Sequence, residues 1–538
     1  MKRKVYAGID IGTTYTCVYY EIEGSRGDYL FRYKNNAIRS AIHYFSDGRT
    51  LVGEAATAEK YVLDGNTVMN VKRVIGQKFN SDHVREAAQS CRAKIREDEH
   101  GNAAFYIPAL QREISAEDVY KDILNFVWSE LKSRVEEYEI DYVTVTYPAV
   151  FRNEGFQAIV RAVEKSDISC HVRFLNEPCA AAIALGNQIL RDGLYVIYDL
   201  GGGTYDLSLV DVKDGKYFDF ITSGGDVRIG GQLFDDKLVD FVNKEYVCLY
   251  DDDIMDFNDR NQKRRLRNYT KLVEMCREGK EELSNSSTTT LDISSFQNQL
   301  FDGMNAEDDR LEEGGMMVVE DNIVLTRARL NEIIKEDISK TIDILKTCLR
   351  EKNKRKNDVE GVILVGGSSN LCIVQEKLRE EFGDRCKISE DLNTVVAKGA
   401  CRYAQDASLV DITIIEYTPF DICTMVQERR REPFYEPIIR RGTLLPTPVI
   451  KKTYKVNCED VVDVIAEGFA ARPSTMTKLK YFEYINLPKG HPVYLDYYFQ
   501  IKKDRTIVYW VQDGDNGVML QEKTVISRDN IDSINCKR

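Results

Sequence analysis

Residues 199–206 read Asp-Leu-Gly-Gly-Gly-Thr-Tyr-Asp, and this stretch decides the fold that the sequence predicts. The β-branched and aromatic run LYVIY precedes it at 194–198, and the alternating run YDLSLVDV overlaps its end at 205–212. Apolar runs on both sides of a glycine cluster indicate two strands joined by a tight turn. The stretch therefore predicts a β-hairpin, and not a strand that feeds a helix.

The turn of this hairpin carries groups that suit a phosphate. Three consecutive glycines have no side chains, so their N–H groups can close around an anion. Asp199 and Asp206 stand at the two ends and would repel phosphate unless a divalent cation lies between them. Mg²⁺ fits that position because it keeps several waters and bridges carboxylates to phosphates. For a single Gly-Gly-Gly turn, an ordinary tight hairpin without a ligand is the alternative.

A second copy of the pattern near the N-terminus favours phosphate binding. Residues 5–20, VYAGIDIGTTYTCVYY, contain a strand, Asp10, the turn Gly12-Thr13-Thr14 and another strand. Two such hairpins about 190 residues apart predict an internally duplicated domain that holds one nucleotide from both sides.

Two other nucleotide-binding folds do not fit the sequence. In a phosphate-loop NTPase, Lys and Ser or Thr follow the glycine loop, whereas Gly231 and Gln232 follow residues 225–230 here. A dinucleotide-binding fold needs Gly-x-Gly-x-x-Gly directly after a strand, and the sequence has no such motif.

Length and composition limit the class of protein. A chain of 538 residues is long enough for roughly two to four domains. The net charge of −13 argues against nucleic-acid binding, because nothing offsets repulsion from the phosphate backbone. None of the 13 cysteines forms a Cys-x-x-Cys pair, and the five histidines are scattered, so no zinc site is predicted. With no signal segment and no long apolar window, we expect a cytoplasmic protein that has no membrane partner.

Several further segments before residue 406 have clear patterns. Residues 66–79 predict an amphipathic helix that carries Lys72. Residues 141–151 predict a buried strand that Pro148 ends. Glu177 begins a segment rich in small residues, which permits close helix packing. Packing does not explain the acidic side chain of Glu177, so we expect it to lie at a boundary between domains.

The last part of the sequence contains a third glycine turn, a connector and then a β-rich region. A third glycine turn, at 366–368, follows a buried strand and suits adenosine binding. Residues 406–416 predict a short extended connector. From 417 onward, short alternating strands separated by Asp, Gly and Asn turns predict an all-β domain, most simply a sandwich.

Together these segments resemble the heat-shock protein 70 (DnaK-type) chaperone family, from near residue 4 to about residue 530. The motifs occur in the family's order and spacing: GIDIGTTYTCV, NTVMNVKRVIG, NEPCAAAIA, DLGGGTYD, LTRARL and ILVGGS, with YTPFDI and IIRRGTLLPT in the β-rich part. The resemblance implies an α/β actin-like duplicated ATPase domain (two lobes, ribonuclease-H-like sheets) at 1–405, an interdomain linker at 406–416 and a β-sandwich substrate-binding domain at 417–538. The helical lid of the family is not expected, because the sequence ends at Arg538.

The resemblance also implies roles for the matching residues. The catalytic set would be Lys72, Glu177, Asp199, Thr204 and Asp206. Asp10 and Asp199 would hold the metal through water. The nucleotide would be wrapped by mostly small residues: Gly12, Thr13, Thr14, Tyr15, Gly201, Gly202, Gly203, Thr204, Gly230, Gly231, Lys280, Ser284, Gly366, Gly367 and Ser368. Interdomain coupling would involve Pro148, Asp411, Ile412, Ile414 and Ile415.

Some positions depart from the family pattern. Glu281 and Asn370 stand where the family stacks the adenine with arginines, and losing two guanidinium faces costs ~1 kcal/mol or more each. Phe156 replaces the arginine that relays the state of the family's switch proline. In the β-domain, Thr424 and Asp463 fall near peptide-pocket positions that are normally aliphatic.

The sequence supports one leading function and two alternatives. The leading expectation is an ATP-dependent chaperone of protein folding and the stress response. It would be a slow ATPase that uses ATP/ADP and Mg²⁺, holds unfolded or extended peptides, and works with J-domain co-chaperones and nucleotide exchange factors. The alternative is a nucleotide-binding regulator or co-chaperone, of the ribosome-associated or exchange-factor type, with little ATPase cycling; the missing lid and Phe156 favour it. A sugar kinase on the same duplicated fold is disfavoured, because the β-rich domain has no place in it.

Overall fold

The computed structural model describes residues 2–526 apart from a set of internal segments. The segments left out are 34–35, 63, 82–83, 86, 89–92, 150, 152, 186–191, 215–216, 227, 251–252, 256–261, 297–321, 388–391, 407–412, 416, 419, 427–431, 457–459, 462–463, 472–475, 482–484, 487–492 and 503–504.

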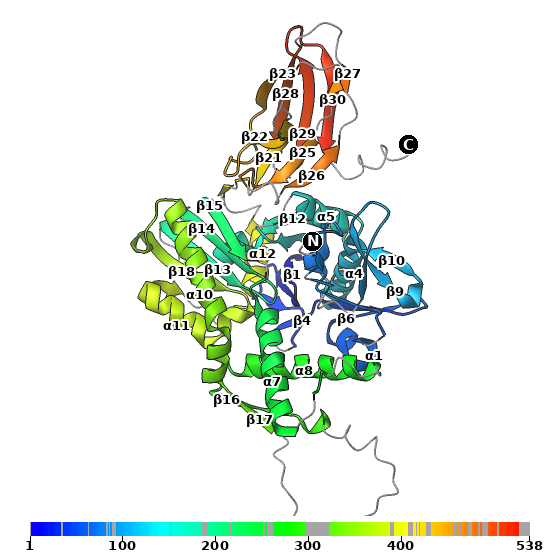
Figure 1. Ribbon diagram of the computed structural model, residues 1–538, viewed down its shortest axis with the longest axis vertical. Coiled ribbons are helices and arrows are strands. Elements are labelled where there is room, and N and C mark those ends of the chain that lie inside the picture. Colours follow the sequence, from blue (N-terminus) through cyan, green and yellow to red (C-terminus); the bar gives the residue numbers. More distant parts are fainter. Residues whose placement is uncertain are drawn as a thin grey trace, which may run out of the picture.

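Two large sheets with the same strand order organise the N-terminal part of the chain (Figure 1). In the first sheet, β1 pairs antiparallel with β2 and parallel with β11, which pairs parallel with β12. In the second, β13 pairs antiparallel with β14 and parallel with β18, which pairs parallel with β19. The first sheet comprises β1 (Lys4–Ile11), β2 (Tyr15–Ile22), β3 (Asp28–Tyr29), β4 (Ala37–Arg39), β11 (Glu139–Tyr147) and β12 (His171–Asn176). The second comprises β13 (Gly193–Leu200), β14 (Tyr205–Lys213), β15 (Tyr217–Asp226), β18 (Val359–Val365), β19 (Cys386–Lys387) and β20 (Thr413–Ile415). This repeated order confirms the predicted duplicated fold.

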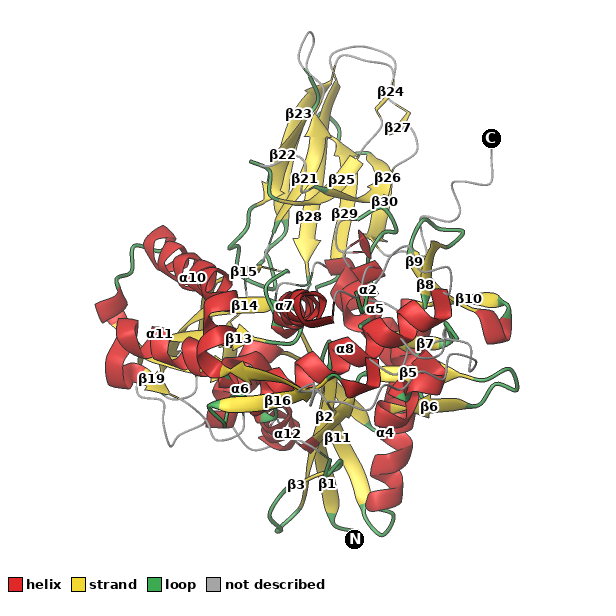
Figure 2. Ribbon diagram, turned by 60° about the horizontal axis from the view of Figure 1, so that its bottom comes forward, coloured by secondary structure: helices red, strands yellow, loops and turns green. Residues whose placement is uncertain are grey.

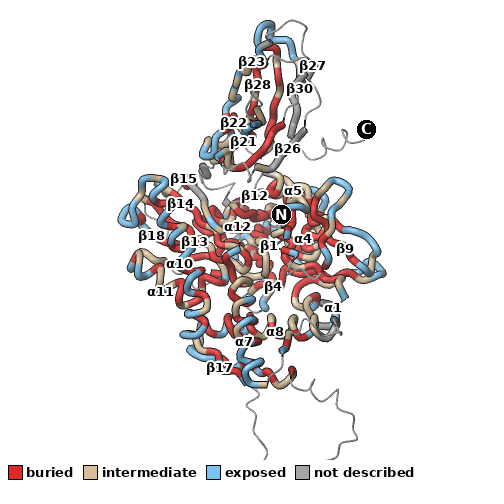
Figure 3. Tube along the Cα trace, in the orientation of Figure 1, coloured by how far each residue is buried: buried red, intermediate tan, exposed pale blue. Residues whose placement is uncertain are grey.

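Helices cover the outer faces of the two sheets and fill the seam between them (Figures 1 and 2). The first sheet shares its core with α4 (Ala116–Arg134) and α5 (Asn153–Glu164). The second shares its core with α7 (Gly231–Tyr250), α8 (Gln262–Glu282), α10 (Arg327–Glu351) and α11 (Cys372–Phe382). Apolar side chains of these helices belong to one of two separate buried clusters, with α8 packed on α7 and β16 (Thr288–Asp292) and not directly on the large sheet (Figure 3). Within the described residues, no helix combines the length and apolarity that a membrane crossing needs.

The seam is built from α6 (Glu177–Leu185) and α12 (Val395–Asp406), which pack against each other. Their contact is so close that a Cβ added to Gly399 would lie 1.7 Å from the carbonyl oxygen of Ala180. The helix α12 also lies against β1, where a Cβ on Gly8 would lie 2.1 Å from the carbonyl oxygen of Ala397. The small residues predicted for this region therefore bring the two halves into direct backbone contact.

Smaller sheets extend both halves. On the first half they are β6-β5-β7 and β10-β9-β8, and on the second half it is β16-β17. Their bounds are β5 (Ala41–Tyr44), β6 (Thr50–Val52), β7 (Thr67–Met69), β8 (Lys94–Glu97), β9 (Ala103–Ile107), β10 (Arg112–Ser115), β16 (Thr288–Asp292) and β17 (Asn322–Thr326). The remaining short helices are α1 (Glu59–Val62) and α2 (Val71–Val74), and the 3-10 turns are η2 (Gly53–Thr57), η3 (Pro108–Leu110), η5 (Lys356–Asp358), η6 (Gly367–Asn370) and η7 (Gly383–Arg385).

The C-terminal part is a β-sandwich that stands on top of the two halves in Figure 1, above β15, β12 and α5. One sheet has the order β22-β21-β25-β26 and the other β23-β28-β29-β30, with a separate pair β24-β27. Inward-facing apolar side chains of both sheets, such as Ile439, Ile465 and Phe499, form one core. The strands are β21 (Asp421–Val426), β22 (Phe434–Ile439), β23 (Ile450–Val456), β24 (Asp460–Val461), β25 (Val464–Gly468), β26 (Thr477–Tyr481), β27 (Ile485–Asn486), β28 (Val493–Ile501), β29 (Ile507–Asp513) and β30 (Met519–Ile526). The predicted sandwich is confirmed.

The helix predicted over 66–79 is wrong. The segment forms β7, then the single turn of α2, and then irregular chain. Asn70 has a φ of 59° and Gly76 a φ of 69°, and both left-handed conformations interrupt a helix. The turn of α2 nevertheless places Lys72 in the interior, where only 7% of the residue is exposed.

Close contact at the seam predicts an unusual response to alanine. In an unhindered helix, Gly→Ala stabilises by ~1 kcal/mol. Gly399→Ala should instead destabilise by ~1–3 kcal/mol, because the new methyl group must push the backbone of α6 away. Calorimetric unfolding would measure the change. Gly279→Ala on α8 is the control, because the atoms nearest its Cβ would be side-chain carbons of Leu291 and Thr289 and not backbone. A stabilised Gly399→Ala variant would contradict the packing described here.

Candidate functional site

The β1–β2 turn and the β13–β14 turn close in the same way. The N–H of Gly12 donates to the carbonyl oxygen of Tyr15 at 2.9 Å, and the N–H of Gly201 donates to that of Thr204 at 3.0 Å. Because each turn follows the first strand of its sheet, the duplicated sheets carry equivalent hairpin loops.

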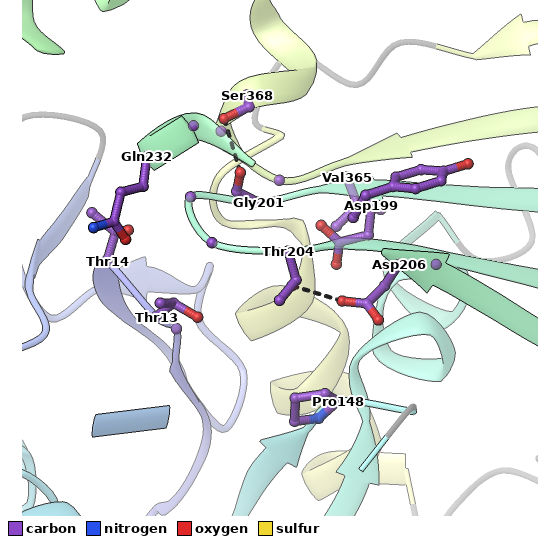
Figure 4. Close-up of a pocket in the computed structure, with 18 of the residues that line it drawn as sticks. Thr13, Thr14, Pro148, Asp199, Gly201, Thr204, Asp206, Gln232, Val365 and Ser368 are labelled. Carbon is purple, nitrogen blue, oxygen red and sulfur yellow. Dashed lines mark hydrogen bonds between the residues drawn. The ribbon is translucent and has the colours of Figure 1, made fainter. Parts of the chain in front are cut away.

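These two turns meet across the seam (Figure 4). A Cβ on Gly202 would lie 2.1 Å from the hydroxyl oxygen of Thr14, and one on Gly203 would lie 2.9 Å from the methyl carbon of Thr13. Only glycine allows the second turn to come this close to the first. The bare backbone of one turn therefore faces the threonines of the other.

The start of α7 and the third glycine turn support the second hairpin from behind. The N–H groups of Gly231 and Gln232 donate to the carbonyl oxygens of Gly201 and Gly202 at 3.0 and 2.7 Å. The Ser368 hydroxyl donates to the carbonyl oxygen of Gly201 at 2.9 Å (Figure 4). The loop at 201–203 is thus held in one conformation by two other segments.

One cavity of about 1750 Å³ joins the three turns. Most of the predicted site residues line it: Asp10, Gly12, Thr13, Thr14, Tyr15, Lys72, Pro148, Glu177, Asp199, Gly201, Gly202, Gly203, Thr204, Asp206, Gly231, Lys280, Ser284, Gly366, Gly367 and Ser368. Gly230 packs behind the second turn, where a Cβ would lie 2.6 Å from the carbonyl carbon of Gly203. Of the predicted coupling residues, Ile414 and Ile415 lie in β20, the edge strand of the second sheet, and Asp411 and Ile412 lie outside the described residues.

Carboxylates from both halves surround one lysine in this cavity. The ammonium nitrogen of Lys72 lies 2.5 Å from Glu177 Oε1 and 3.7 Å from Asp10 Oδ1. Asp10 also accepts a hydrogen bond of 2.8 Å from the Thr146 hydroxyl, which fixes its orientation. Glu177 is the first residue of α6, so the seam helix carries it to the lysine.

In the same cavity, the Thr204 hydroxyl donates to Asp206 Oδ2 at 2.8 Å (Figure 4). Burial raises the pKa of Asp206 to about 6, and it raises that of Glu177 to about 7 against the opposing effect of Lys72. Burial and repulsion from Glu177 and Asp206 also raise the pKa of Asp199 well above its ordinary value. The Glu177 and Asp10 carboxylates raise the pKa of Lys72, although its burial acts in the opposite direction.

This charge balance fits a hydrated divalent cation. Negative charge exceeds the single ammonium group, so a cation between the carboxylates would relieve their repulsion. Among the described residues, no three His, Cys, Asp or Glu side chains converge closely enough to bind a metal directly. Asp10 and Asp199 both line the cavity and could hold such a cation through water molecules.

The far end of the cavity lies between α8 and the third turn. Lys280 donates to the carbonyl oxygen of Gly231 at 2.9 Å and forms an ion pair of 2.6 Å with Asp235. Gly366 has a φ of 83°, and a Cβ there would lie 2.5 Å from Asp199 Oδ1. This end of the cavity is lined by small and polar residues, and the bonds to Gly231 and Asp235 fix the orientation of Lys280.

Glu281 joins the two halves at this end. The Tyr15 hydroxyl donates to Glu281 Oε1 at 3.2 Å, and the Arg277 guanidinium lies 3.8 Å from the same oxygen. The Arg39 guanidinium stands 5.2 Å from the centre of the Tyr15 ring. The side-chain amide of Asn370 donates to its own turn, at the carbonyl oxygen of Gly367.

Sequence reasoning missed the arginines of the cavity. Arg39 and Arg277 line it beside Tyr15, and Arg73 donates to the carbonyl oxygen of Gly203 at 2.5 Å. Arg73 follows Lys72 directly, which was a usable signal. Arg39 and Arg277 carry no such signal, because their partners lie far away in the sequence.

Two departures in the predicted peptide-binding part have different outcomes. Thr424 is buried in β21, between β22 and β25. Asp463 lies outside the described residues.

Comparisons with known proteins agree with this geometry. Residues 6–447 match the family described as Hsp70 protein. A heat shock protein of Pyricularia oryzae is 30% identical over 464 residues, covering 83% of this chain and 70% of the relative. A chaperone protein DnaK of Psychrobacter cryohalolentis is 27% identical over 451 residues, covering 82% of this chain and 64% of the relative. The family match, the duplicated sheets and the facing glycine turns together place this chain in the Hsp70 family.

Proposed function

We propose that the chain binds ATP with Mg²⁺ between the two glycine turns and hydrolyses it slowly as a molecular chaperone. The observation that carries the proposal is the meeting of two equivalent turns around Lys72 and a surplus of carboxylates. In this proposal residues 1–405 form the nucleotide-binding domain, 406–416 the linker and 417–538 the domain that holds unfolded peptide. J-domain co-chaperones and nucleotide exchange factors are the partners that family membership suggests, and the cytoplasm is the compartment.

Binding would use the backbone more than side chains. The turns at 12–15 and 201–204 both line the cavity, and three of the four residues of the second turn are glycines, so backbone N–H groups there can approach a phosphate. Lys280, Ser284 and the turn at 366–368 line the end that would take the nucleoside. A bound Mg²⁺ would neutralise phosphate charge and orient the terminal phosphate.

Hydrolysis would depend on positioning and on charge. Lys72 is held by Glu177 and Asp10, so its ammonium group can face the terminal phosphate without a reorganisation cost. Thr204 and Asp206 form a hydrogen-bonded pair in the same cavity, and Asp206, with a pKa of about 6, is mostly ionised at neutral pH. In this scheme the attacking water forms the new P–O bond, the bond to the leaving ADP breaks, and the water's proton passes toward Asp206.

A nucleotide-holding regulator with little cycling remains the second candidate. Glu281 is the observation that favours it, because it places a carboxylate bonded to Tyr15 at the end that would take the adenine. Such a protein would bind nucleotide but turn it over at the rate of its Lys72→Ala variant.

Metal dependence tests the binding proposal. Replacing Asp199 by Asn removes one partner of the cation, so the Kd for ATP with Mg²⁺ should rise about tenfold, which corresponds to ~1.4 kcal/mol. Affinity for ATP in EDTA should not fall, because the buried carboxylate repels phosphate. Isothermal titration calorimetry measures both, with the exposed Asp384→Asn as control. Unchanged magnesium dependence in Asp199→Asn would contradict the assignment.

Lys72→Ala tests the hydrolysis proposal. Single-turnover hydrolysis should slow by about 10²–10³-fold, as when an oriented transition-state donor is lost, whereas ATP affinity changes only a few-fold. Lys335→Ala on the exposed side of α10 controls for loss of a surface cation. Thermal unfolding would check that the variant is folded. Wild-type turnover in Lys72→Ala would rule out this role.

A further inference from the structure

The turn between β28 and β29 carries a buried arginine into the ATPase part of the molecule. In Figures 1 and 2 these strands run down toward α5 and the seam. Arg505 lies in this turn, yet only 6% of it is exposed. Its guanidinium carbon stands 5.1 Å from the centre of the Tyr147 ring and 5.6 Å from that of Phe156. An arginine of the sandwich therefore rests on two aromatic rings of the first half.

The receiving surface is an aromatic cluster at the end of β11. The rings of Tyr147 and Phe156 are 4.6 Å apart, and Phe156 meets Phe174 edge-on at 5.7 Å. Tyr147 and Phe156 are each only 4% exposed. A guanidinium over aromatic faces gains more when it is removed from water, as it is here.

The backbone of Arg505 supplies independent evidence that its side chain matters. Its φ of 59° lies in the left-handed region, which disfavours residues with a β-carbon. Its N–H donates to the carbonyl oxygen of Lys502 at 3.0 Å, which holds the backbone of Arg505 in this conformation. Glycine would satisfy this turn without strain, and such strain is typically kept where a side chain has a function.

Three consecutive residues connect this contact to the nucleotide cavity. Thr146 donates to Asp10, Tyr147 lies under Arg505, and Pro148 lines the cavity. Alternate residues of a strand point to opposite faces, so β11 presents Thr146 to the site and Tyr147 to the sandwich. Residues of the sandwich, Phe420 and Phe469, line the same cavity from another side.

We propose that Arg505 is a positioning residue that locks the β-sandwich onto the Tyr147–Phe156 pair and so couples its docking to the geometry of Asp10 and Pro148. In the family resemblance, Phe156 replaces an arginine of the ATPase domain. Here a guanidinium reaches Phe156 from the sandwich, so this contact exists only while the sandwich is docked. The coupling to nucleotide rests on the proposed ATP site, whereas the docking does not.

Coupling of this kind is reciprocal. If docking orders Thr146 and Pro148, bound Mg²⁺ and ATP must favour the docked arrangement by the same factor by which docking improves their affinity. Loss of the arginine should therefore change both properties, although Arg505 touches neither the phosphates nor the metal partners.

Arg505→Gly is the first test variant, because it removes the cation and relieves the positive φ, so the sandwich itself should stay folded. Without nucleotide, small-angle X-ray scattering should show a larger radius of gyration than wild type. Calorimetry should show ~5–10-fold weaker binding of ATP with Mg²⁺. Lys502→Ala is the matched control, because it removes an exposed cation from the same turn and should match wild type in both. Arg505→Lys keeps the charge but loses the planar group. Its radius of gyration and its ATP affinity should therefore lie between those of wild type and Arg505→Gly.

A double-mutant cycle with Phe156→Ala isolates the pair. The losses in Arg505→Gly and Phe156→Ala should not add in the double variant, because each removes the same contact. Arg505→Gly that scatters and binds like Lys502→Ala would overturn the proposal, and so would additive losses. Undocking without a change in ATP affinity would overturn the coupling. If wild type binds no nucleotide, the proposed function fails, while scattering still decides whether Arg505 holds the sandwich.

Discussion

Repulsion among buried carboxylates is the constraint on which the rest of this structure depends. Asp10 and Glu177 approach Lys72 from the first half and the seam, and Asp199 and Asp206 approach from the second half. Such groups stay together only where scaffolding holds them, because each would gain by moving into water. The glycine turns, the seam helix α6 and the hydrogen bond from Thr146 all serve that placement. Stability is given up at this point, and a bound cation would offset the repulsion.

The duplication covers five equivalent strands of the two sheets, but the sixth strands and the chemistry of the turns differ. Both hairpins close with the same backbone hydrogen bond, yet the first turn carries Thr13 and Thr14 where the second is bare glycine. If both turns carried side chains they could not approach, since a Cβ on Gly202 would overlap Thr14. The threonines of the first turn therefore fit against the bare glycines of the second, and both turns line the same cavity.

The local sequence was sufficient to predict most of the fold and of the residues that line the cavity. The glycine turns, their aspartates and the alternating strands each lie within a short stretch, so their pattern predicted the sheets, the duplication and the sandwich. Lys72 was placed in the wrong element, because the left-handed Asn70 that breaks the helix has no marker in the apolar periodicity. Arg277 and Arg505 could not be predicted as contact residues, since their partners Tyr15 and Tyr147 are adjacent only after folding.

The contact between Gly399 and Ala180 has a mechanical consequence. The helix α12 lies on the first sheet, and α6 shares a core with the second, so the two halves touch through these helices. At Gly399 the two helices meet through backbone, and near the end of α6 the Arg402 side chain of α12 donates to the carbonyl oxygens of Ile183 and Ala184. Interdigitated helices resist sliding, whereas smooth ones can shear past each other with few rotamer changes. Because each half keeps its own hydrophobic core, a small shear between α6 and α12 would leave both cores intact.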